Sequence, residues 1–148
     1  MIRWDTVEVK TAVDLVTHFV LTVMLAGYFR WLTNGWAWPA LAVTGGILID
    51  ADHFIDHFLF YGWRFNFADF FCHRYQSCGK CYIFFHSWEI VFMLWALSLV
   101  VSWLTPLASG MTLHLVTDNL YSHRQNPQYL FLWHRWRRGF AVEKDASN

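Results

Sequence analysis

Four long apolar segments follow one another along the chain, and each is long enough, or nearly so, to cross a bilayer as a helix. A transmembrane helix takes about 20 predominantly apolar residues, and its backbone groups are bonded internally. The segments cover residues 11–33, 38–60, 81–104 and 106–121. Asn34-Gly35 ends the first, Pro106 ends the third, and Gly110 interrupts the short fourth. The pattern predicts an all-α fold, an integral membrane four-helix bundle forming one domain over residues 1–148.

The chain after the fourth segment has a different pattern. Between residues 127 and 140, aromatic and aliphatic side chains are interleaved with arginines. Such a segment is typical of a helix that lies in the membrane interface, with Trp133 and Trp136 as anchors. We therefore expect an interfacial C-terminal helix at 127–140.

The basic residues predict the orientation of the bundle. With four spans, the N-terminus, the loop 61–80 and the C-terminus share one side of the membrane. Of the 11 Lys and Arg residues, only Arg30 lies near the other face. The positive-inside rule then makes the shared side cytoplasmic.

Composition agrees with a membrane protein. The chain is 56% hydrophobic, 20% aromatic and 15% charged, which departs from an ordinary soluble domain. Its 11 basic residues equal its 11 acidic residues, so no nucleic-acid partner is expected. The first apolar segment is too long for the core of a signal peptide, and none is expected.

Ionisable side chains occur in all four apolar segments. Each costs about 2.5–3.5 kcal/mol at the centre of a bilayer, so such residues are usually buried in the bundle and functional. They are Asp14, His18, Asp50, Asp52, His53, Asp56, His57, His86, Glu89, His114 and Asp118. At a rise of about 1.5 Å per residue, all lie within roughly three turns of the cytoplasmic ends. We expect one polar pocket at that depth.

The residue types in this pocket favour a metal site. Imidazole with carboxylate is the ligand set of zinc and of non-haem iron or manganese, whereas calcium prefers oxygen alone. Residues three or four apart share a helix face, which pairs most of these groups. The alternative is a polar network or proton pathway without metal.

Roles are predicted for each polar residue. The expected metal ligands are His18, Asp50, His53, His86, His114 and Asp118. Asp52 and Glu89 are the candidates for a bridging ligand or the catalytic general base. Further ligands, or residues that fix imidazole tautomers, are expected among Asp14, Asp56, His57 and His123.

Four motifs resemble a known family. They are Thr17-His18, the run Gly-Gly-Ile-Leu-Ile-Asp-Ala-Asp-His over residues 45–53, His86-Ser87, and Gly-Met-Thr-Leu-His-Leu-Val-Thr-Asp over residues 110–118. In order and spacing they resemble small bacterial inner-membrane proteins described as membrane-bound metal-dependent hydrolases. The chain departs from that pattern at Ile49, where the family has proline. It also lacks the family's His-Arg shortly before His-Ser, because His73-Arg74 lies too far upstream.

That family is distantly similar to the zinc-dependent phospholipase C and single-strand nuclease group, whose His-x-x-x-Asp pair His114 and Asp118 match. The resemblance implies a phosphoester hydrolase of the bacterial inner membrane. One to three divalent ions, zinc before iron or manganese, would activate a water. The expected substrate is a membrane lipid or lipid-linked phosphate.

Two further groups of residues carry open questions. Arg74, Arg124 and the arginines of 135–138 either bind the substrate phosphate or serve topology and lipid attraction, and the second reading is favoured. The loop residues Cys72, His73, Cys78 and Cys81 form either a structural zinc clip or free cytosolic thiols.

Two other function classes compete with the hydrolase. A di-iron carboxylate oxidase or desaturase would use Glu-x-x-His pairs, but here His86 precedes Glu89. A metal or proton transporter would need polar residues through the outer half of the spans, where there is almost none. A homo-oligomer is compatible with each of these functions.

Overall fold

The fold is helical throughout the part of the chain that the structure, a computed structural model, describes: residues 6–64, 80, 82–121 and 130–141. The α-helices are α1 (Thr6–Thr33), α2 (Ala37–Gly46), α3 (Asp52–Tyr61), α5 (Trp88–Ser98), α6 (Thr105–Tyr121) and α7 (Leu132–Arg137). Two 3₁₀ turns, η1 (Leu48–Ala51) and η3 (Ser102–Leu104), precede α3 and α6. In these residues no strand occurs beyond an isolated bridge between Lys80 and Ala141. The all-α prediction is confirmed.

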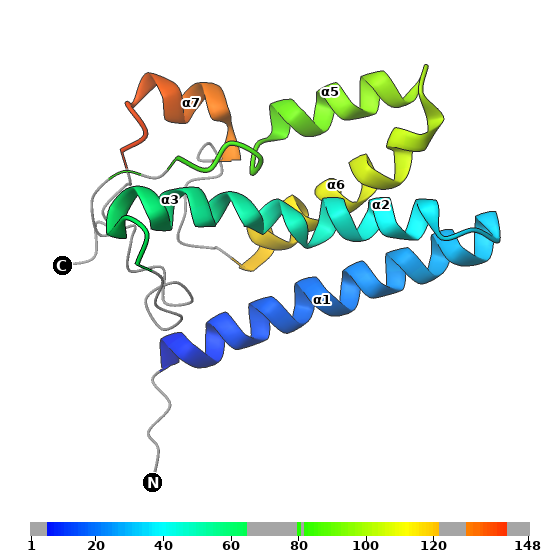
Figure 1. Ribbon diagram of the computed structural model, residues 1–148, viewed down its shortest axis with the longest axis horizontal. Coiled ribbons are helices and arrows are strands. Elements are labelled where there is room, and N and C mark those ends of the chain that lie inside the picture. The colour runs from blue at the N-terminus through cyan, green and yellow to red at the C-terminus, as the bar shows by residue number, and fades with distance from the viewer. Residues whose placement is uncertain (1–5, 65–79, 81, 122–129, 142–148) are drawn as a thin grey trace, which may run out of the picture.

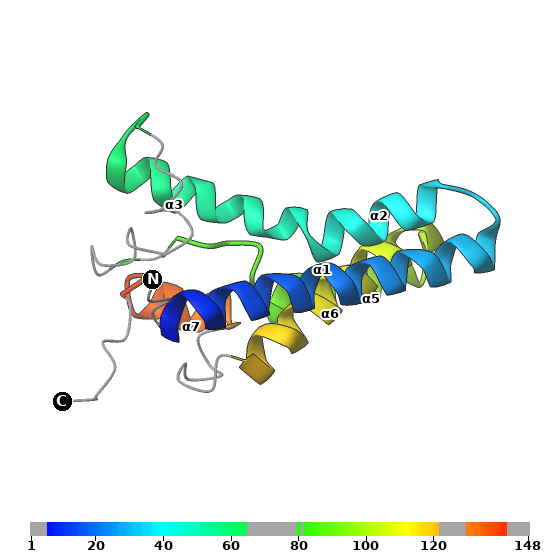
Figure 2. The same cartoon turned by 90° about the horizontal axis from the view of Figure 1, so that it is seen from below.

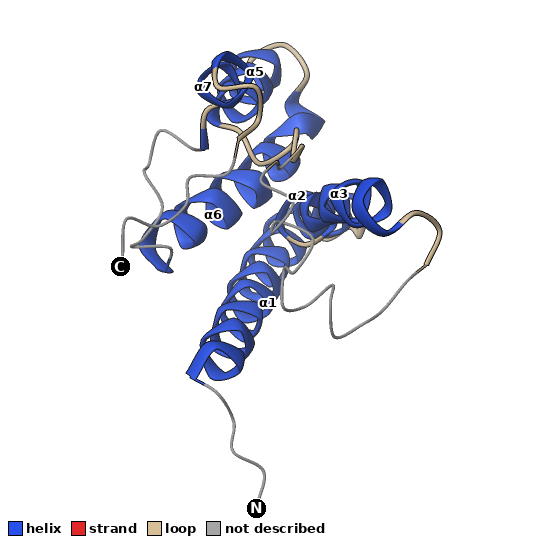
Figure 3. Cartoon of the chain, turned by 90° about the vertical axis from the view of Figure 1, so that its left-hand side faces the viewer, coloured by secondary structure: helices blue, strands red, loops and turns tan. Residues whose placement is uncertain are grey.

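Helices α2 and α6 form the centre of the arrangement. Helix α2 packs against both α6 and α1, and α6 also contacts α1 and α5. Helices α2 and α3 follow each other along nearly one line, and α1 runs beside α2 (Figures 1 and 2). Seen from one end, α1 and α5 lie on opposite sides of the molecule (Figure 3).

Three glycines let these helices approach closely. A Cβ at Gly45 would collide with the Leu107 carbonyl of α6, and a Cβ at Gly110 with the Ala42 carbonyl of α2. A Cβ at Gly46 would meet the Thr22 side chain of α1. Small residues at helix crossings are typical of membrane bundles. The expectation that Gly110 interrupts its helix is wrong, because α6 continues through it to make this contact.

The second apolar segment is not one helix, as 38–60 had been expected to be. Helix α2 ends at Gly46, Ile47 adopts φ −123° and ψ −48°, and the chain continues through η1 into α3. Adjacent glycines have low helix propensity, and here they are needed for packing. The break therefore falls directly after the Gly-Gly pair.

The third apolar segment, 81–104, is helical only over α5. Before α5, the N–H groups of Tyr82 and Phe85 donate to the α3 carboxylates of Asp56 and Asp52 at 2.6 and 2.8 Å. These bonds replace the helical ones, so residues 82–87 stay non-helical. In the C-terminal tail, the expected helix at 127–140 is the short α7.

One described helix is long and apolar enough to cross a membrane. It covers Ala12–Thr33, 22 residues, and 17% of its most apolar window is buried. Its outer face exposes Val16, Phe19 and Met24 at 61%, 59% and 66%. The arrangement of four membrane spans stays a prediction.

Candidate metal centre

The six predicted ligands come together in one cluster. His18 comes from α1, Asp50 from η1, His53 from α3, His86 from the segment before α5, and His114 and Asp118 from α6. His18, His86 and His114 are buried, and the side chain of Asp50 is 41% exposed. The cluster is thus enclosed by imidazoles and open beside a carboxylate.

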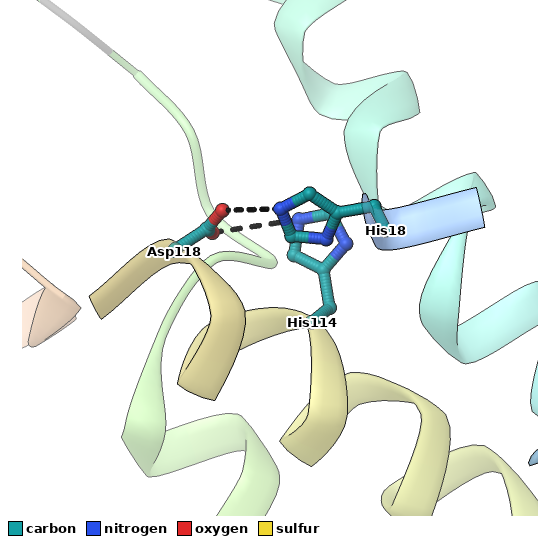
Figure 4. A group of neighbouring side chains, drawn as sticks. All are labelled: His18, His114 and Asp118. Carbon is teal, nitrogen blue, oxygen red and sulfur yellow. Dashed lines mark ion pairs between the residues drawn. The ribbon is translucent and has the colours of Figure 1, made fainter. Parts of the chain in front are cut away.

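The first group within this cluster joins α1 to α6. His18 Nε2 lies 3.1 Å from Asp118 Oδ1, and His114 Nε2 lies 3.4 Å from Asp118 Oδ2 (Figure 4). The two imidazole rings face each other with centroids 4.2 Å apart. Both rings therefore direct a nitrogen at one carboxylate.

The second group consists of Asp50, His53 and His86. His86 Nε2 and His53 Nε2 lie 3.1 and 3.9 Å from the same oxygen, Asp50 Oδ1. In each group the ligand atoms all lie within 4.8 Å of one another, as binding of a single ion requires.

His114 links the two groups. Its Nε2 lies 3.3 Å from Asp50 Oδ1 and 3.1 Å from His86 Nε2, in addition to its contact with Asp118. One imidazole nitrogen therefore borders both candidate ion positions.

The tautomers of two imidazoles follow from their outer partners. His86 Nδ1 lies 3.0 Å from a carboxylate oxygen of Asp52, and His114 Nδ1 lies 2.9 Å from the carbonyl oxygen of Gly46. Both partners are acceptors, so each Nδ1 carries the proton and donates it. In the neutral rings both Nε2 atoms then present lone pairs to each other and to Asp50. A shared proton or a metal ion between the two Nε2 atoms and Asp50 would relieve the repulsion of these lone pairs.

The helix break supplies one of these acceptors. In a continuous α-helix the Gly46 carbonyl would accept the N–H of Asp50, four residues later. Here the Asp50 N–H donates to Ile47 O at 3.2 Å, as in a 3₁₀ turn. The Gly46 carbonyl is thereby left to accept the Nδ1–H of His114.

The spacing of the donors suits a zinc ion. With metal–nitrogen and metal–oxygen bonds of about 2.0–2.1 Å, two tetrahedral ligand atoms lie about 3.3–3.4 Å apart. The closest donor pairs in the cluster are 3.1–3.4 Å apart. The residues present thus fit a divalent ion in both identity and separation.

The two candidates for the general base have other contacts in the structure, and their catalytic role stays a prediction. Asp52 is 1% exposed and lies against the Phe85 N–H and His86 Nδ1, where it can orient the His86 ring. Glu89 accepts the N–H groups of Leu132 and Trp133 at 2.9 and 3.0 Å. It thereby satisfies free amides at the start of α7.

Of the remaining acidic and imidazole candidates, one lies at the edge of the cluster and two make contacts outside it. Asp14 Oδ1 lies 3.4 Å from His18 Nε2, at the edge of the first group. Asp56 binds the Tyr82 N–H, and the fully buried His57 lies 3.2 Å from Arg64 O. Asp56 and His57 therefore hold the segments that flank the loop.

Several predicted residues lie outside the described parts of the chain. They are Cys72, His73, Arg74, Cys78, Cys81, His123 and Arg124. The zinc clip in the loop and the contacts of Arg74 and Arg124 with phosphate stay predictions.

The structure buries one arginine that the sequence had placed at the surface. Arg135, expected at the surface with its neighbours, is 1% exposed and donates to the carbonyls of Ile83 and His86.

Comparisons with protein-family models, with curated proteins and with solved structures find no match for this chain. The family resemblance therefore rests on the motifs alone.

Proposed function

We propose that this chain is a membrane-embedded, metal-dependent hydrolase that cleaves a phosphoester of a lipid or lipid-linked substrate. The observation that carries the proposal is the convergence of the His86 and His114 Nε2 atoms on Asp50. Both rings are held in the tautomer that presents lone pairs, so the cluster has the donors and the shape of a metal site. Zinc is the favoured ion, and each of the two groups could hold one ion.

The donor set also supports hydrolysis. A divalent ion held by His and Asp lowers the pKa of a bound water and withdraws charge from phosphate oxygens. The cluster is open beside Asp50, the side from which a water and a phosphate could enter. Asp118 is also partly accessible, with a side chain 21% exposed. The motifs around His114 and Asp118 add the resemblance to phosphoester hydrolases.

The apolar surface supports a membrane location with four spans. Large apolar side chains are exposed along α1, α3 and α5, among them Phe19, Phe60 and Phe92 at 59%, 42% and 60%. Exposure on this scale is typical of a lipid-facing surface. Helix α2, η1 and α3 together cover residues 37–61, long enough at about 1.5 Å per residue for a hydrocarbon core of about 30 Å.

The direction of the helices supports the predicted orientation. The start of α1 and helix α7 lie at one end of the molecule, and the α1–α2 connection lies at the other (Figure 1). At that other end, Arg30 donates to Asn34 and its guanidinium lies 5.1 Å from the Trp36 ring centroid. The arginines of α7 would then face the cytoplasm.

The donor set disfavours the di-iron oxidase. That class relies on glutamate ligands, and among the described residues the cluster contains only aspartate and histidine, because Glu89 binds α7.

Metal content tests the proposal directly. Full-length protein, purified in detergent without added chelator, is expected to hold a transition metal at one or two ions per chain by elemental analysis. His114→Ala/Asp118→Ala is expected to lose it, because the first group keeps only His18 and the second loses the imidazole that lies against Asp50 and His86. The matched control is His134→Ala, which removes an imidazole of α7 that lies outside the cluster. Wild type without stoichiometric metal would overturn the metal site.

Turnover tests the reaction separately. Metal-loaded protein in mixed micelles is expected to release the headgroup or phosphate from phospholipid or isoprenoid phosphate, and chelation is expected to stop it. Metal-bearing protein inactive on both substrate types would contradict the hydrolase while leaving the metal site standing.

A further inference from the structure

A non-helical segment, residues 82–87, carries one imidazole into the cluster and is held on one side by α3. Two α3 carboxylates accept its backbone N–H groups: Asp56 accepts that of Tyr82 at 2.6 Å, and Asp52 that of Phe85 at 2.8 Å. Helix α3 thus satisfies backbone donors of the segment. The carbonyl groups of residues 82–87 need a hydrogen-bond donor from another element.

Helix α7 provides that donor. The guanidinium of Arg135 donates through one nitrogen to the carbonyl of Ile83, and through another to the carbonyl of His86 at 2.9 Å. Arg135 is 1% exposed, although it belongs to a short helix with exposed neighbours. Its two acceptors enclose the residues that lead into His86.

Helix α7 is itself tied to the same segment. Both oxygens of Glu89, in the first turn of α5, accept N–H groups from Leu132 and Trp133. The ring of Phe140, just after α7, lies 5.1 Å from that of Tyr82. These contacts fix the position of α7, so the Arg135 guanidinium is held next to the carbonyls of Ile83 and His86.

We propose that Arg135 is a positioning residue for the metal centre, acting through the backbone of His86. By fixing the two carbonyls it keeps the segment bent, with His86 Nδ1 at Asp52 and Nε2 at Asp50 and His114. A buried carbonyl without a donor is costly where water is scarce, and the planar fork of arginine can donate to two carbonyls at once. The role of the residue in metal binding rests on the proposed function.

Cobalt binding tests this role. Full-length protein in detergent is stripped of metal and titrated with Co²⁺, whose visible absorption reports ligand number and geometry. Arg135→Met is expected to weaken binding by about 10- to 100-fold, as loss of a supporting contact does, and to give the spectrum of His86→Ala. Arg135→Lys is expected to fall between wild type and Arg135→Met. The control, Arg137→Met, removes an exposed arginine stacked over Trp133 and is expected to match wild type.

Hydrogen exchange of the metal-free protein provides a second readout. Arg135→Met is expected to speed amide exchange across residues 82–91 and to leave α1 unchanged. If Arg135→Met does not fold, Arg135→Lys is measured in its place, with the same direction expected. A Co²⁺ titration identical to wild type, equal losses in the Arg137→Met control, or unchanged exchange in 82–91 would overturn the proposal. Wild type that takes up no Co²⁺ would defeat the metal function, and exchange alone would then decide whether Arg135 positions the segment.

Discussion

The two halves of the candidate metal cluster are built in different ways. His18, His114 and Asp118 stand on regular turns of α1 and α6, where side chains four residues apart share a face. Asp50 lies in a 3₁₀ turn and His86 in a non-helical segment, and both positions depend on contacts far away in sequence. Helical periodicity is sufficient to build the first half. The second half requires a backbone that departs from the helix, and other side chains must hold that departure in place.

The largest effect is expected where the halves meet. Because His114 Nε2 borders both groups, His114→Ala should abolish metal retention and reduce turnover to background, whereas His18→Ala should remove only the metal of the first half. Elemental analysis and Co²⁺ spectra of the two variants make the comparison. Half the metal surviving in His114→Ala would show that the halves are independent.

The next largest effect is expected at the orienting carboxylate of the irregular half. Asp52→Asn should weaken metal binding by about 10- to 100-fold, because a neutral amide oxygen holds the Nδ1 proton of His86 less strongly than a carboxylate does. Asp56→Asn is the matched control, since Asp56 likewise accepts a backbone N–H of the segment and its variant should leave affinity within a few-fold of wild type. Equal losses in competitive metal titrations would mean that only the backbone contacts matter.

A moderate effect on stability is expected at the crossing of α2 and α6. Gly110→Ala places a Cβ against the Ala42 carbonyl and 2.9 Å from the Gly46 nitrogen, so it should lower the free energy of unfolding by about 1–3 kcal/mol. Gly27→Ala, at a helix position with nothing within 4 Å of the added carbon, should raise it by up to about 1 kcal/mol. Thermal unfolding in detergent measures both. Two alanines with the same effect would contradict the close approach.

The smallest effect is expected at Asp14, at the edge of the half formed by His18, His114 and Asp118. Asp14 Oδ1 lies 3.4 Å from His18 Nε2, farther than the 3.1 Å of Asp118 Oδ1, and the Asp14 side chain is 38% exposed. Asp14→Asn should change metal affinity by only a few-fold, well below the effect of Asp118→Asn. An equal loss in the two variants would make Asp14 a ligand.

The sequence was sufficient to predict the all-α fold and the residues that converge, because depth along each apolar segment and helical spacing are readable from it. It did not reveal the break after Gly46, since that break depends on how closely α6 approaches α2. The backbone contacts of Asp52 and Glu89 were also missed. A carboxylate that binds a distant backbone N–H has the same local pattern as one that faces a ligand. The burial of Arg135 was hidden for the same reason, because its acceptors are main-chain carbonyls that carry no residue-type signal.

The interruption at Ile47 also has a consequence for protein design. An engineer who grafted the same six side chains onto four ideal, uninterrupted helices would preserve every spacing in the linear motif. In such a scaffold the carbonyl oxygen of Gly46 would accept a hydrogen bond within its own helix. The His114 ring would then lose the acceptor that fixes its orientation. A design that copies the ligands must therefore also copy the 3₁₀ turn that follows Ile47.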